Sequence, residues 1–192
     1  MKINFGIENL EVKNYLIFVT ALFFLSIGVG VIFAYVYPLS SSLLSTLPQL
    51  AEPLKDLTSF EFMLFIFMNN TFKSFLAITL GILLGIYPLL LVVGNGYLLG
   101  RLFYDVCLDR GIYFVLACLI PHGILEIPAV LLSCALGVKL GYLFCKRYAK
   151  KPVPDLRTEL MKCMRIFLFL ILPLLLIGSF VEVWITPIFI GS

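Results

Sequence analysis

The chain has 192 residues, of which 61% are hydrophobic and only 13% are charged, and its mean hydropathy is +1.09. A soluble domain carries about 25% charged residues, so this composition excludes one. The net charge of +3 comes from basic residues beside apolar segments, where they act as topology signals rather than as a nucleic-acid surface. We therefore predict an all-α, polytopic transmembrane helical bundle forming a single domain over residues 1–192, in contact with membrane lipids and with no nucleic-acid partner.

The first predicted span covers residues 15–37, which carry no ionisable side chain except tyrosines near both ends. This length crosses a bilayer, and the tyrosines fit the aromatic belts of a span. The following polar region has a leucine at every third or fourth position, which predicts an amphipathic interfacial segment over residues 41–68. These leucines are Leu43, Leu47, Leu50, Leu54 and Leu57.

A second span is predicted over residues 74–94, inside an uncharged run that Pro88 should kink. Charged residues from Arg101 to Arg110 then mark a return to water or headgroups. The last span is predicted over residues 166–188, after a basic connection. That connection holds Lys139, Lys146, Arg147, Lys150, Lys151, Arg157, Lys162 and Arg165.

The basic connection sets the orientation, because Lys and Arg in short loops stay on the cytoplasmic side. We predict a multi-pass protein of the plasma membrane with its N-terminus in the cytoplasm and its C-terminus outside, which requires an odd number of spans. Five spans fit only if both ends of residues 111–145 face the cytoplasm. As helix, that stretch reaches about 50 Å against about 60 Å for two full crossings. We therefore expect a short or re-entrant hairpin with spans 111–121 and 128–145, broken at residues 121–128.

The expected break carries an intramembrane polar motif made of Pro121, His122, Gly123, Glu126 and Pro128. Proline lacks an N–H and disfavours helix at the preceding residue, which would open the backbone here. His122 and Glu126 either satisfy that backbone structurally or handle a proton, an ion or a substrate. Metal ligation is a third reading, but two ligands are too few and the sequence has no second histidine, so we expect neither a metal nor a cofactor.

Further polar and small residues support helix packing. Asn69, Asn70 and Asn95 are interpreted as amides that bond to opened backbone or to a neighbouring helix. Small residues spaced four apart let helix backbones approach closely, so two such faces should meet, within one chain or across a homo-dimer. These packing residues are Ala77, Gly81, Gly85, Gly96, Gly100, Ala129, Ser133, Gly137 and Gly141.

Enzyme signatures such as GxSxG, HExxH and a Walker loop are missing, so the protein is more easily interpreted as a non-enzyme. One catalytic reading stays open, in which Ser133 and His122 serve intramembrane hydrolysis. The cysteines are interpreted as small buried hydrophobes, because they form no close pair. They are Cys107, Cys118, Cys134, Cys145 and Cys163.

Several of these features follow one another in a set order: Asn69-Asn70, a glycine-rich span, Asn95-Gly96, the PHGxxExPA block at residues 121–129, and then Gly137 and Gly141. This order resembles that of the stage II sporulation protein M family. The resemblance implies a membrane anchor that recruits peptidoglycan-remodelling or other cell-envelope proteins. Our first interpretation is therefore a homo-dimeric membrane scaffold in which the polar break organises the bundle and the loops recruit partners. The alternatives are a small transporter or channel that uses Glu126 and His122, and an intramembrane or lipid-handling enzyme.

Overall fold

The computed structural model describes residues 10–37 and 57–187, without the side chains of Leu10, Glu11, Cys118, Pro121 and His122. The described residues form helices and no strands, and five helices are long and apolar enough to cross a membrane. The prediction of an all-α bundle with about five spans is confirmed. The elements are α1 (Leu10–Val36), α4 (Ser59–Thr79), the 3-10 turn η1 (Leu80–Ile82), α5 (Ile86–Arg110), α6 (Ile112–Tyr148), α7 (Leu156–Ile166), the π-helical turn η2 (Phe167–Ile171), α8 (Leu172–Phe180) and the π-helical turn η3 (Val181–Ile185).

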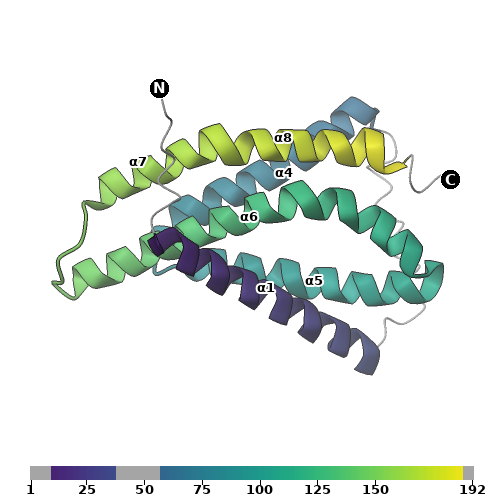
Figure 1. The fold of residues 1–192 in the computed structure, drawn as a ribbon, viewed down its shortest axis with the longest axis horizontal. Coiled ribbons are helices and arrows are strands. Elements are labelled where there is room, and N and C mark those ends of the chain that lie inside the picture. Colours follow the sequence, from purple (N-terminus) through teal and green to yellow (C-terminus); the bar gives the residue numbers. More distant parts are fainter. Residues whose placement is uncertain (1–9, 38–56, 188–192) are drawn as a thin grey trace.

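Helix α6 is the central element of the bundle (Figure 1). It contacts each of the other helices, and 67% of an apolar 18-residue window in its span Gly123–Tyr148 is buried inside the protein, whereas the corresponding window of no other span exceeds 33%. The remaining helices therefore keep most of their apolar surface for lipid. In a bilayer such surface needs no protein cover, because lipid tails are as apolar as leucine.

The structure corrects the predicted interfacial segment and the second span. Residues 41–56 lie outside the described residues, but residues 59–68 form the first half of the span α4, which begins at a capping box. There the Thr58 hydroxyl accepts from the Glu61 N–H at 3.3 Å, and the Glu61 carboxylate accepts from the Thr58 N–H at 2.8 Å. These bonds satisfy N–H groups that a helix start leaves unpaired, so Glu61 caps the start of α4.

Residues 74–94 are not one span, because the chain reverses between Leu80 and Gly85. Leu84 and Gly85 have positive φ angles of 60° and 72°, a conformation that glycine adopts without steric cost. Pro88 then lies in the first turn of α5, where its missing N–H would be unpaired anyway. Pro88 therefore helps to start a helix here instead of kinking one.

The predicted hairpin broken at residues 121–128 is wrong. Residues 112–148 form one α-helix, and its two ends lie at opposite ends of the bundle. Figure 1 shows α6 curving over its first half, where both prolines lie. Proline bends a transmembrane helix without ending it where neighbouring groups satisfy the freed carbonyls. The number of spans is still five, because residues 59–110 supply two spans and residues 111–145 supply one, the reverse of the predicted division.

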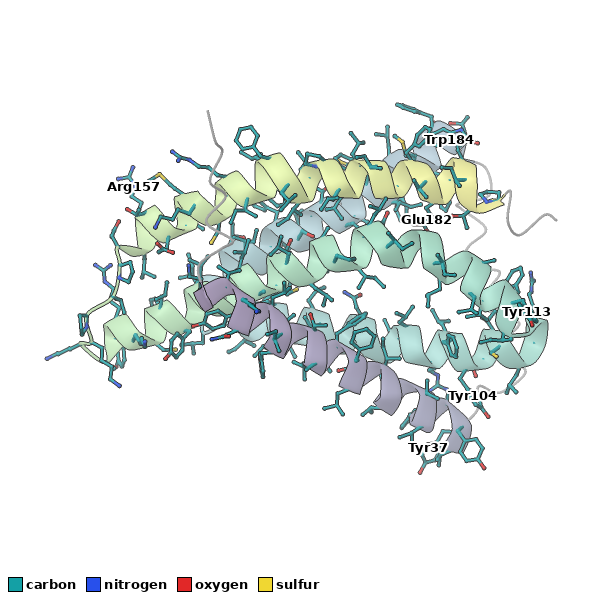
Figure 2. All side chains as sticks on the ribbon, viewed as in Figure 1. Tyr37, Tyr104, Tyr113, Arg157, Glu182 and Trp184 are labelled. Carbon is teal, nitrogen blue, oxygen red and sulfur yellow. The ribbon has the colours of Figure 1, made fainter. Side chains whose placement is uncertain are left out.

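The two ends of the bundle differ in composition. Tyr37, Tyr104 and Tyr113 lie at one end together with Trp184, whereas Arg157 lies at the other (Figure 2). The basic turn between α6 and α7 and the start of α1 share that second end. Aromatic side chains at such a position mark a membrane interface, since their rings are apolar and their tips are polar.

Candidate functional site

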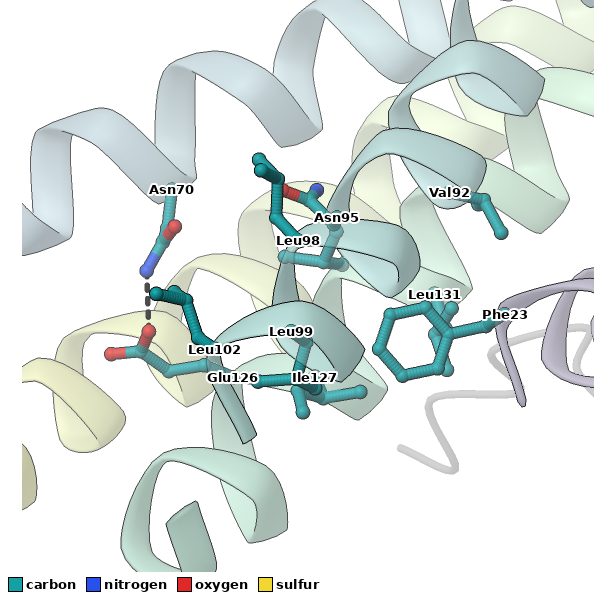
Figure 3. Close-up of a pocket in the computed structure, with 11 residues that line it drawn as sticks. Phe23, Asn70, Val92, Asn95, Leu98, Leu99, Leu102, Glu126, Ile127 and Leu131 are labelled. Atoms are coloured by element: carbon teal, nitrogen blue, oxygen red, sulfur yellow. Dashed lines mark hydrogen bonds between the residues drawn. The ribbon is translucent and has the colours of Figure 1, made fainter. Parts of the chain in front are cut away.

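Glu126 lies near the middle of α6, and only 1% of its surface is exposed. The Asn70 side chain of α4 donates a hydrogen bond from Nδ2 to the Oε2 of Glu126 (Figure 3). A buried carboxylate accepts hydrogen bonds and cannot donate them, so an amide N–H is a matched partner. The sequence placed both residues among the polar candidates, and the structure brings them together.

Helix α8 closes over Glu126 through Gly178. A methyl group added at Gly178 would lie 2.5 Å from Cγ and 3.2 Å from Oε1 of Glu126. Only a glycine lets α8 approach so closely. Three helices, α4, α6 and α8, therefore meet at one carboxylate. Sequence reasoning missed Gly178, although the neighbouring small residues Gly178 and Ser179 inside the last apolar span were the available signal.

A cavity of about 210 Å³ adjoins Glu126 on its other side. Its described wall is mostly aliphatic and aromatic, and the polar groups among the described lining residues are Asn70, Asn95 and Glu126 (Figure 3). The apolar lining consists of Phe23, Val92, Leu98, Leu99, Leu102, Ile127, Val130 and Leu131. Helices α1, α4, α5 and α6 thus enclose an apolar space with a few polar groups, the usual composition of a ligand site.

The other predicted motif residues have different surroundings. The backbones of Pro121 and His122 belong to α6, but their side chains lie outside the described ones, so the roles predicted for His122 stay predictions. Gly123 is half-buried, Pro128 is exposed, and Asn69 is exposed on α4 beside the half-buried Asn70. Of the three predicted amides, only Asn70 and Asn95 reach the cavity.

Small residues join the helices at two interfaces within the chain. At the first, Gly81 and Ala77 contact Gly137, and Gly85 contacts Gly141, so tightly that an added methyl group would overlap backbone atoms. Ala129 is buried close by in the same helix face. Close backbone approach of this kind holds membrane helices together. The faces that we considered for a dimer therefore meet inside one protomer.

The second small-residue interface joins α1 to α5. Gly100 lies against the Ile27 carbonyl and Gly30 against the Tyr97 carbonyl, while a methyl group at Gly96 would lie 2.7 Å from the Phe23 carbonyl oxygen. Gly30 was not among the predicted packing residues. Arg101 of α5 adds a hydrogen bond near the end of α1, donating to the Tyr37 carbonyl at 3.0 Å.

A buried charge cluster lies where α7 packs on α6. Lys139 Nζ is 2.8 Å from Glu159 Oε2, and Lys162 Nζ is 2.6 Å from Glu159 Oε1. The Lys139 and Glu159 side chains are 10% and 5% exposed. We had interpreted Lys139 and Lys162 only as topology signals. Sequence spacing gave no hint of this cluster, because Lys139 and Glu159 lie on different helices.

The catalytic and metal alternatives involve Ser133 and clusters of ligating side chains. Ser133 is buried and donates its hydroxyl hydrogen bond to the Ala129 carbonyl at 2.9 Å, as a packing serine does. No group of three or more His, Cys, Asp and Glu side chains there is placed to hold a metal ion. Cys134 and Cys163 are buried thiols, but Cys145 is exposed, so its interpretation as a buried hydrophobe is wrong.

These observations define a multi-pass membrane protein with a polar site inside a helical bundle. Its sequence matches the family described as stage II sporulation protein M over residues 19–187, and the chain belongs to that family. The resemblance inferred from the polar motif is thereby confirmed.

Two uncharacterized proteins of Methanocaldococcus jannaschii are similar to this chain. One is 31% identical over 126 residues, which cover 64% of this chain and 69% of the relative. The other is 42% identical over 59 residues, which cover 31% of this chain and 26% of the relative. No solved structure matches the chain.

Proposed function

We propose that the protein is a non-enzymatic membrane scaffold that holds membrane or cell-envelope partner proteins. The observation that carries this proposal is the convergence of α4, α6 and α8 on Glu126, with Asn70 bonded to it and Gly178 packed against it. Such a convergence fixes the mutual position of three helices. A rigid bundle that presents constant surfaces at both ends is what a scaffold requires.

The basic end of the bundle is the proposed cytoplasmic end. Lys146, Arg147, Lys150 and Lys151 gather at the end of α6 and in the turn that follows it. Retention of such residues in the cytoplasm would place the start of α1 inside and the end of α8 outside. If the protein forms a homo-dimer, the contact surface lies outside the two small-residue interfaces, because both are occupied within the chain.

Site-specific photocrosslinking in the native membrane tests the scaffold. A photoreactive residue at Arg157, at the basic end, should form a defined protein adduct, whereas one at the lipid-facing Leu90 should not. The adduct should be lost in Asn70→Leu, which removes the bond to Glu126. It should persist in Glu126→Gln, because the glutamine carbonyl still accepts from Asn70. A folded Asn70→Leu protein with an unchanged adduct, or no adduct at either position, would contradict the proposal.

A small transporter or channel is the second candidate, favoured by the cavity beside Glu126. A carboxylate inside a span is a common site for a proton or cation. Here Glu126→Gln separates the two functions, since it keeps the hydrogen-bond acceptor and removes the charge. A transporter predicts ion-dependent flux into proteoliposomes that this substitution abolishes, whereas the scaffold predicts no specific flux at all.

A further inference from the structure

The cavity beside Glu126 opens sideways between helices. Leu98 and Leu102 line it on α5, yet 55% and 47% of their surfaces are exposed. Side chains that border an internal space and also face outward mark its mouth. Both lie on the same face of α5, one turn apart, and α5 spans the membrane by length and composition. The mouth therefore faces lipid and not an aqueous phase.

The cavity lies deep in the bundle. Asn95 is nine residues from the start of α5, or about 14 Å at 1.5 Å per residue, close to half the thickness of a hydrocarbon core. Asn70 lies near the middle of α4 in the same way. A molecule that reaches these groups from the mouth must be soluble in the membrane.

The lining selects the chemistry of such a molecule. Leu98, Leu99 and Leu102 form an apolar wall, in which Asn95 is a half-buried polar group. The carboxylate of Glu126 accepts hydrogen bonds only, and the amide of Asn95 both accepts and donates. The complementary molecule has an apolar body and a head that donates hydrogen bonds.

We propose that this cavity is a binding site for a membrane-dissolved amphiphile with an amine or hydroxyl head. The head lies between Glu126 and Asn95, and the chain leaves along Leu98 and Leu102 through the lateral mouth. A cavity of about 150 Å³ admits benzene, so the 210 Å³ found here holds such a head with the first part of its chain. This binding activity is independent of the scaffold function.

Photoaffinity labelling of the full-length protein in phosphatidylcholine nanodiscs tests the site. The probes are a diazirine-bearing decylamine, the matching decanol and a headless decane with the same diazirine. The amine and the alcohol should label peptides around Leu98 and Leu131 well above the headless probe. Glu126→Gln should reduce that labelling about tenfold, which corresponds to one lost charge-assisted hydrogen bond.

Two further variants keep the test decisive if Glu126→Gln unfolds. Leu99→Trp should block both headed probes by filling the cavity, and Asn95→Leu should weaken them by removing a polar wall group. Leu90→Trp, on the exposed side of the same helix, is the matched control and should leave labelling unchanged. Equal labelling by the headless probe would mean that the cavity takes hydrocarbon tails only. That result, or indifference to Leu99→Trp, overturns the proposal.

Discussion

Two buried glutamates in this bundle are held in opposite ways. Glu126 lies at mid-bundle, with a neutral amide from Asn70 bonded to it and an apolar cavity at its side. Glu159 lies near the basic end, between the ammonium groups of Lys139 and Lys162. The bonded partner described for Glu126 is thus a neutral amide, whereas the two described for Glu159 are cations. Charge neutralisation therefore stabilises the helix contact at Glu159, and hydrogen bonding with close packing stabilises the contact at Glu126.

Removing Lys139 should have the largest effect of the changes considered. Lys139→Ala removes the buried partner of Glu159 and leaves the exposed Lys162 beside it. Removing one partner of a buried ion pair costs about 3 kcal/mol. The free energy of unfolding in mixed micelles measures this loss. The double variant Lys139→Met, Glu159→Leu should return most of it, because apolar residues replace a buried ion pair at little cost. A double variant as unstable as Lys139→Ala would show that the ion pair is not replaceable by packing.

Enlarging Gly178 breaks the Glu126 site by crowding. Gly178→Ala would place a methyl group 2.5 Å from Glu126 Cγ, so α8 must shift, at a cost of about 2 kcal/mol in the free energy of unfolding. Gly94→Ala on α5 is the control, because nothing lies within 4 Å of its added methyl group. The control should be neutral or slightly stabilising, as alanine favours helix. Equal effects at both glycines would rule out close packing on Glu126.

The same isosteric substitution sharpens the comparison between the two acids. Glu126→Gln keeps an acceptor for Asn70 and should lower the free energy of unfolding by less than about 1 kcal/mol. Glu159→Gln weakens bonds to two lysines and leaves the mostly buried Lys139 without a charged partner, so it should cost about 2 kcal/mol. Unfolding of the two variants under one condition measures the difference. A reversed order would place the charge-dependent contact at Glu126.

The helical class, the number of spans and the family could be predicted from the sequence, because hydropathy and motif order are local properties of the chain. The division into spans could not. Pro88 has the same missing N–H whether it kinks a helix or lies in its first turn, and the left-handed turn at Gly85 decides between these outcomes. Pro128 would likewise end a helix in water, but it is tolerated within the transmembrane helix α6.

The candidate site was predicted in part for the same reason. Glu126 and Asn70 stand out in the sequence because polar residues are rare in spans. Gly178, in contrast, matters only through its contact with Glu126 on another helix, and the Lys139 to Glu159 pair depends on how α7 folds back on α6. Contacts between distant segments follow from tertiary packing, which no local pattern in one sequence reports.

The smallest effect concerns pH at Asp155, which begins the helix that carries Glu159. Its carboxylate accepts from the Thr158 N–H at 3.2 Å, and this hydrogen bond, with the Thr158 hydroxyl and Arg147, lowers the pKa of Asp155. A lowered pKa means that the helix start is stabilised above the ordinary value of about 3.9 and loses that stabilisation as pH falls through the lowered value. Hydrogen exchange at the Thr158 amide should therefore speed up, relative to its intrinsic rate, only in strong acid.

Asp155→Asn is the matched control for this prediction, since asparagine also caps a helix but does not titrate. Its Thr158 amide should keep the same protection across the acid range. Protection that falls equally in both proteins would assign the change to another group. In the wild-type protein, the acid-dependent loss of amide protection should be limited to the first turn of α7, which carries Glu159, because the effect of a cap is confined to the helix end.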